Sequence, residues 1–121
     1  EATAILAGDA LLTLAFAMLS DAKAVEPAKA AMWLEVIDVI AEAAGGSGMV
    51  GGQLLDIAAE GRSVTLSELE ALQRMKTGAL IQASVRTGAV MGNADSEQME
   101  SLDDYAPAVV FQPGLFFTAR P

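Results

Sequence analysis

The sequence contains neither cysteine nor histidine. Their absence excludes disulfides, thiolate or imidazole metal sites, Ser-His-Asp triads and cysteine nucleophiles. A chain without cysteine is compatible with a reducing compartment, and we expect a cytoplasmic location. Any chemistry here must use carboxylates, amides, hydroxyls and a small number of cationic side chains.

Basic residues are scarce as well. Seven lysines and arginines face 16 aspartates and glutamates, which gives a formal charge of −9. Nucleic acid is bound by cations that neutralise phosphates, so we expect no nucleic-acid partner. An anionic ligand such as a diphosphate would need local lysines or arginines, with divalent cations as bridges.

Aromatic residues make up only 5% of the chain, whereas 53% of it is hydrophobic and rich in alanine. Alanine costs least in a helix, and its small side chain allows helices to pack closely. A length of 121 residues suits one domain with a core of its own. The composition therefore predicts an all-α protein.

Five helical segments follow from the positions of glycine, proline and capping residues. They cover about residues 2–20, 27–44, 49–60, 65–91 and 96–105. Pro27 suits a first helical turn, and Thr65 with Glu68 forms the pattern of a capping box. Pro107 is expected to end the last helix. We expect one domain over residues 1–112 and an atypical tail over residues 113–121.

The first of these segments is apolar enough to raise the question of a membrane span. Asp9 near its centre costs about 2.5–3.5 kcal/mol on insertion scales. The chain begins with Glu1 rather than the basic residues of a secretory signal. We interpret residues 2–19 as a buried core helix and expect no membrane partner.

Three groups of residues are candidates for a functional site. Gln53 and Asp56 share one helix face directly after the Gly51-Gly52 pair, which allows a neighbouring backbone or a ligand to come close. The alternative for Asp56 is an ordinary solvated position.

Lys76 and Thr77 form the second candidate group, and Gly78 after them leaves the local backbone open. The alternative for Lys76 is a side chain that extends from the helix into solvent. Asp103-Asp104 forms the third group, but adjacent residues point about 100° apart on a helix. We interpret this pair as a solvated helix end.

Three stretches together resemble the all-α isoprenyl (polyprenyl) diphosphate synthase family, which includes farnesyl and geranyl diphosphate synthases. They are AILAGDALL at 4–12, GMVGGQLLD at 48–56 and LEALQRMKTGALI at 69–81. The resemblance covers about residues 1–112 and implies part of the isoprenoid-synthase helical bundle.

The resemblance also implies an activity. In this family magnesium ions draw the diphosphate from an allylic substrate, and isopentenyl diphosphate attacks the resulting carbocation. Lys76 and Thr77 would then be catalytic residues that hold the allylic diphosphate, while Gln53 and Asp56 line the same cavity. Phe111-Gln112 resembles a pair that approaches isopentenyl diphosphate. A homodimer is expected.

The sequence departs from the family in its metal ligands. No Asp-rich cluster precedes the first stretch, and Leu115, Phe116 and Ala119 stand where the second cluster would place aspartates. We therefore expect no complete magnesium site in this chain, although the resemblance implies Mg²⁺. The change after Gln112 suggests a truncation, a reading-frame slip or an incomplete gene. Product length cannot be read from these residues.

Three hypotheses follow. The first is a fragment of a trans-prenyltransferase that is inactive or severely impaired as given. The second is a non-catalytic subunit or helical interaction module that pairs with itself or with a full-length synthase. The third is an unrelated alanine-rich bundle.

Overall fold

The computed structural model describes residues 1–21 and 26–110, without the side chains of residues 109 and 110. The described residues form helices joined by short turns, with no strand among them. The predicted all-α fold class is therefore confirmed. The chain divides into two compact units, Glu1–Asp38 and Val39–Pro121.

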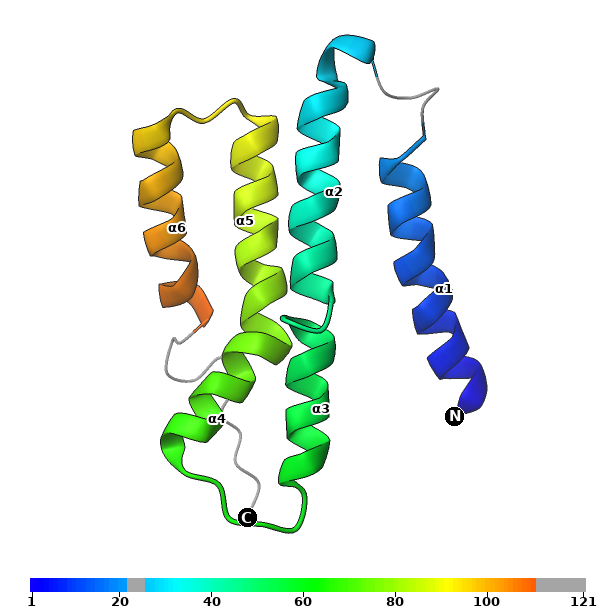
Figure 1. Cartoon of the computed structure of the whole chain (residues 1–121), viewed down its shortest axis with the longest axis vertical. Helices are drawn as coiled ribbons and strands as arrows, with labels where there is room; N and C mark the ends of the chain where they lie inside the picture. The colour runs from blue at the N-terminus through cyan, green and yellow to red at the C-terminus, as the bar shows by residue number, and fades with distance from the viewer. Residues whose placement is uncertain (22–25, 111–121) are drawn as a thin grey trace. The chain divides into compact units, whose positions relative to one another are not determined.

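Helix α1 spans Ala2–Leu19 (Figure 1). Within the first unit α1 is not the buried core helix that the sequence predicts, because none of its residues is buried there. Leu6 and Met18, for example, are 66% and 69% exposed. Apolar side chains lie around the whole helix rather than along one face, so a single packing partner could not cover them. By length and composition alone α1 could cross a membrane. Core helices of soluble proteins and signal sequences meet the same two criteria.

The second predicted segment begins with a 3₁₀ turn, η1, at Pro27–Lys29 and continues as α2 over Ala30–Ala44. Pro27 occupies the first turn, as predicted, where its missing N–H would have no helical partner. The ammonium of Lys29 lies 3.2 Å from the Glu26 carboxylate. Both side chains are well exposed, so this ion pair adds little stability.

Helix α3 spans Met49–Ala59. The turn before it brings the backbone of Gly48 close to the end of α2. A Cβ at Gly48 would lie 2.0 Å from the carbonyl oxygen of Ala43, so only glycine fits without a shift of backbone. The α2–α3 turn therefore depends on this residue for its close approach.

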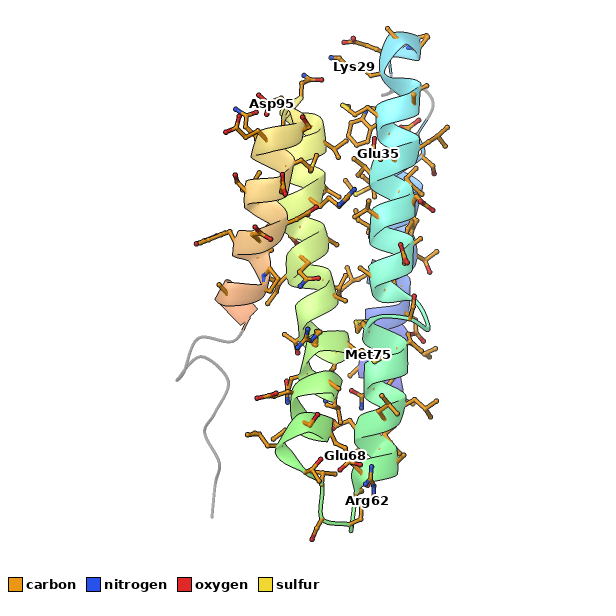
Figure 2. All side chains as sticks on the ribbon, turned by 60° about the vertical axis from the view of Figure 1, so that its left-hand side comes forward. Lys29, Glu35, Arg62, Glu68, Met75 and Asp95 are labelled. Carbon is orange, nitrogen blue, oxygen red and sulfur yellow. The ribbon has the colours of Figure 1, made fainter. Side chains whose placement is uncertain are left out.

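Helix α4 spans Leu66–Gln73 and begins with the predicted capping box. The Thr65 hydroxyl accepts from the Glu68 amide at 3.2 Å, and the Glu68 carboxylate accepts from the Thr65 amide at 2.7 Å. Arg62 donates to the same carboxylate at 3.2 Å, and Figure 2 shows these two side chains near the lower end of α3. The Thr65 amide first, and Arg62 next, lower the pKa of Glu68 from its ordinary value of 4.5.

The predicted helix over 65–91 is continuous but is not a uniform α-helix. Between α4 and α5 (Ala79–Met91) the chain forms a π-helical turn, η2, over Arg74–Gly78. Figure 1 shows α4 bending away from the line of α5 at this point. A π-turn contains an extra residue, so it changes the direction of the side chains that it carries.

Helix α6 spans Ser96–Val110 and lies beside α5 (Figure 1). Asp95 and Gln98 exchange backbone-to-side-chain hydrogen bonds of 2.9 and 3.0 Å, a second capping box. The prediction that Pro107 ends this helix is wrong, because α6 continues through it to Val110. Proline removes one intrahelical hydrogen bond and crowds the preceding turn, but a helix can tolerate this at a local cost.

The buried apolar residues of the second unit are mostly alanines, as the composition predicts. Small side chains let helical backbones approach closely, so a compact core forms here with few large residues. These residues are Ala43, Ala44, Leu72, Ala83, Ala89 and Ala106.

Candidate functional site

Helix α3 touches the π-turn at the level of the backbone. A Cβ built on Gly52 would lie 2.3 Å from the amide nitrogen of Lys76 and 2.6 Å from its Cα. No side chain fits between these two segments. The prediction that the Gly51-Gly52 pair admits a neighbouring backbone is confirmed, and the neighbour is the segment that carries Lys76.

One helical turn after Gly52, Asp56 meets the side chain of Lys76. The Lys76 ammonium donates to Asp56 Oδ2 over 2.5 Å, and the two side chains are 35% and 42% exposed. Asp56 is therefore paired rather than simply solvated, and Lys76 does not extend freely into solvent. Both groups still have a solvent-facing side through which a ligand can reach them.

Met75, the residue before Lys76, fills the space beside Gly51. A Cβ on Gly51 would lie 2.0 Å from the carbonyl oxygen of Gly46 and 3.0 Å from the terminal methyl carbon of Met75, which Figure 2 labels between α3 and the neighbouring helical run. Gly51 therefore allows the close turn before α3, and only Gly52 meets the backbone of the π-turn. The sequence gives no clear signal for this wide turn, because Ala79 continues the apolar spacing of an ordinary helix four residues after Met75.

The other predicted site residues are placed differently. Gln53 lies on α3 one turn before Asp56 and is exposed, whereas Thr77 lies in the π-turn and is half-buried. Neither side chain makes a hydrogen bond to another residue of the described segments. Phe111 and Gln112 lie outside the described residues. The structure therefore brings together Asp56 and Lys76, and Thr77 follows Lys76 in the chain.

The described residues do not provide a magnesium site. Nowhere in residues 1–21 and 26–110 do three or more acidic side chains gather closely enough to hold a metal ion. The carboxylate of Asp56 already accepts from Lys76. Asp103 is exposed, as the sequence predicts, but it lies within α6 rather than at its end and pairs with Arg86 of α5 at 2.9 Å. The carboxylates on the described helices thus do not fit a magnesium clamp.

Comparison with known proteins decides the family. The family profile described as polyprenyl synthetase matches residues 1–117. The chain belongs to the polyprenyl synthetase family. It is 47% identical to farnesyl diphosphate synthase of Geobacillus stearothermophilus and 49% identical to that of Escherichia coli, over 99% of this chain in each case. Membership excludes the hypothesis of an unrelated alanine-rich bundle.

Solved structures of family members share the fold. A putative farnesyl-diphosphate synthase from Marinomonas superposes with a TM-score of 0.82 at 45% identity, over 91% of this chain and 40% of its own. A geranyltransferase from Helicobacter pylori, solved with magnesium and isoprenyl diphosphate, gives 0.78 at 34% identity, over 90% of this chain and 35% of its own. The predicted part of an isoprenoid-synthase bundle is confirmed.

The chain spans only 39% of the length of the two curated relatives above. The family match passes the Gln112 limit expected for the resemblance and reaches residue 117. The atypical tail predicted from residue 113 lies outside the described residues, and its structure stays a prediction.

Proposed function

We propose that this chain forms one wall of the diphosphate-binding cavity of a trans-prenyltransferase of the farnesyl or geranylgeranyl diphosphate synthase type. The observation that carries the proposal is the partly exposed side chain of Lys76, whose ammonium pairs with Asp56 at the contact between α3 and the π-turn. The relatives are farnesyl diphosphate synthases, and the family resemblance implies the substrate class, an allylic diphosphate that condenses with isopentenyl diphosphate.

In this proposal the chain's own residues bind and orient the leaving group. Lys76 presents a point charge to the allylic diphosphate, and the Thr77 hydroxyl next to it donates to a phosphate oxygen. Asp56 holds the lysine in place, and exposed Gln53 offers an amide on the same helix. Phe111 and Gln112 would approach isopentenyl diphosphate.

A complete reaction needs more than this wall. Magnesium, when bound, would neutralise the charge that develops on the departing diphosphate. The described helices lack a fitting set of carboxylates for it. We therefore propose that the 121 residues alone are inactive or severely impaired in condensation. Rapid product formation from geranyl diphosphate, isopentenyl diphosphate and magnesium would overturn this part of the proposal.

Calorimetry with inorganic pyrophosphate tests the binding role directly. Replacing Lys76 by methionine should weaken binding by about fivefold or more, because one charge at ~4 Å is worth at least ~1 kcal/mol in water. Lys29→Met is the matched control, since Lys29 also pairs with a carboxylate but lies on a different element. Equal losses in both variants, or unchanged binding in Lys76→Met, would count against the proposal.

A second candidate is a non-catalytic interaction module. The observation that favours it is α1, which carries exposed leucines and isoleucine without a buried residue. Light scattering at increasing concentration tests it, because a module that pairs with itself should form a dimer. A monomer at high concentration would contradict self-pairing and leave mixing with a full-length synthase as the next measurement.

A further inference from the structure

We infer that Gly52 is a positioning residue for Lys76: its missing side chain lets α3 rest on the π-turn backbone, which places Asp56 within reach of the lysine. The inference rests on the proposed function only for its consequence on diphosphate binding. The packing relationship itself is independent of any ligand.

The contact is between backbones, so no neighbour can give way cheaply. An alanine methyl at residue 52 would lie 2.3 Å from the Lys76 amide nitrogen and 2.6 Å from its Cα. Both distances are too short for real Cβ contacts, which stay above 3.0 Å. One segment must therefore move by about an ångström or more. A flexible side chain could have rotated aside, but main-chain atoms of a helical turn cannot.

The displacement would separate the charged pair. Asp56 lies four residues after Gly52, on the same side of α3. Its short side chain reaches the Lys76 ammonium at 2.5 Å in the packing that the backbone contact allows. A shift of the π-turn would leave Lys76 and Thr77 at a new angle to any ligand, and misplacement of about 1 Å is enough to weaken a positioned site strongly.

The chain contains two glycines that separate this role from general effects of glycine replacement. A Cβ at Gly88 in α5 would have nothing within 4 Å, so alanine there adds only helix propensity. Gly48 has a clash of similar size, but with the carbonyl oxygen of Ala43 at 2.0 Å rather than with the π-turn. Gly48→Ala thus strains α3 without touching Lys76.

The test follows the Lys76 ammonium resonance by NMR in the full chain. Asp56→Asn should shift this resonance in the parent protein, because the hydrogen-bond partner of Lys76 changes. The same shift is expected when Asp56→Asn is combined with Gly88→Ala or with Gly48→Ala. When Asp56→Asn is combined with Gly52→Ala, the Lys76 resonance should not shift, because the pair is already separated. An equal shift in the Gly52→Ala background overturns the inference, since Gly52 would then be dispensable for the pair.

A measurement on the unmodified chain covers the case in which Gly52→Ala does not fold. A nuclear Overhauser effect between the Gly52 α-protons and the Lys76 amide proton is expected from the backbone contact, and its absence overturns the inference.

Pyrophosphate binding separates the role of Gly52 from the proposed function. Gly52→Ala should weaken it by about tenfold, ~1.4 kcal/mol, and Gly88→Ala should not. If the parent binds no pyrophosphate, the proposed function fails while the NMR result still decides the role of Gly52.

Discussion

Lys76 and Asp56, 20 residues apart in the sequence, meet through a hydrogen bond of 2.5 Å between ammonium and carboxylate. Asp56 comes from α3 and Lys76 from the π-turn, so the pair reports directly on how these two segments are packed. It also sets the charge that an incoming anion would meet. A free lysine attracts a diphosphate, whereas a lysine already neutralised by a carboxylate does so less strongly.

Asparagine in place of Asp56 keeps a side-chain oxygen that can accept from Lys76, so the lysine stays in position, but it removes the negative charge. Binding of pyrophosphate should therefore tighten when magnesium is absent. One repelling charge at ~4 Å costs about 1 kcal/mol in water, so affinity should rise by about fivefold. Stability should change by no more than ~1 kcal/mol, because both side chains are more than a third exposed. Calorimetry in the presence of a chelator measures the change. Asp103→Asn, which neutralises a carboxylate paired with Arg86, is the control, and an equal gain there would point to net charge alone.

The capping box predicts a dependence of stability on acid. The pKa of Glu68 is lowered from 4.5, first by the Thr65 amide and then by Arg62, so its folded pKa lies below its unfolded one. The carboxylate therefore contributes stability above pH 4.5, and this contribution is lost as the pH falls through the folded pKa. Denaturant unfolding at several pH values should show a loss below pH 4.5 that is smaller in Glu68→Gln. Identical slopes for both proteins would contradict this role.

The helices were predictable from the sequence because their signals are local. Pro27 in a first turn and the Thr65-Glu68 pattern each act within four residues, and the structure bears both out. Pro107 misled the prediction, since a proline weakens a helix locally without always ending it. The burial of α1 could not be read from composition, because burial depends on the surfaces that surround a helix.

The sequence predicts which residues belong to the site but not how they contact one another. Asp56 and Lys76 were both candidates, but their pairing depends on a backbone contact across 20 residues, which no local pattern encodes. The π-turn has no such pattern either, because Ala79 keeps ordinary helical spacing after Met75. It is found only in the structure, where Gly52 lies against the backbone of Lys76.

The paired aspartates of α6 offer a matched comparison. Asp103 pairs with Arg86 at 2.9 Å, with side chains 47% and 44% exposed, whereas the adjacent Asp104 has no ion-pair partner among the described residues. Asp103→Asn should lower the free energy of unfolding by about 0.2–1 kcal/mol, and about 0.5 M salt should reduce the difference. Asp104→Asn should leave stability nearly unchanged. Equal effects from the two substitutions would show that the ion pair contributes nothing.

Gly61 and Gly88 allow the cost of a positive φ to be measured without the effect of a steric clash. A Cβ at either position would meet nothing within 4 Å, but Gly61 has a φ of +75° whereas Gly88 is helical. Gly61→Ala should lower the free energy of unfolding by about 1–2 kcal/mol, because L-residues are strained at positive φ. Gly88→Ala should raise it by about 0.5–1 kcal/mol, because alanine loses less entropy in a helix. Denaturant unfolding of both variants measures the difference, and a Gly61→Ala protein as stable as the parent would mean that the turn after α3 relaxes to negative φ at no cost.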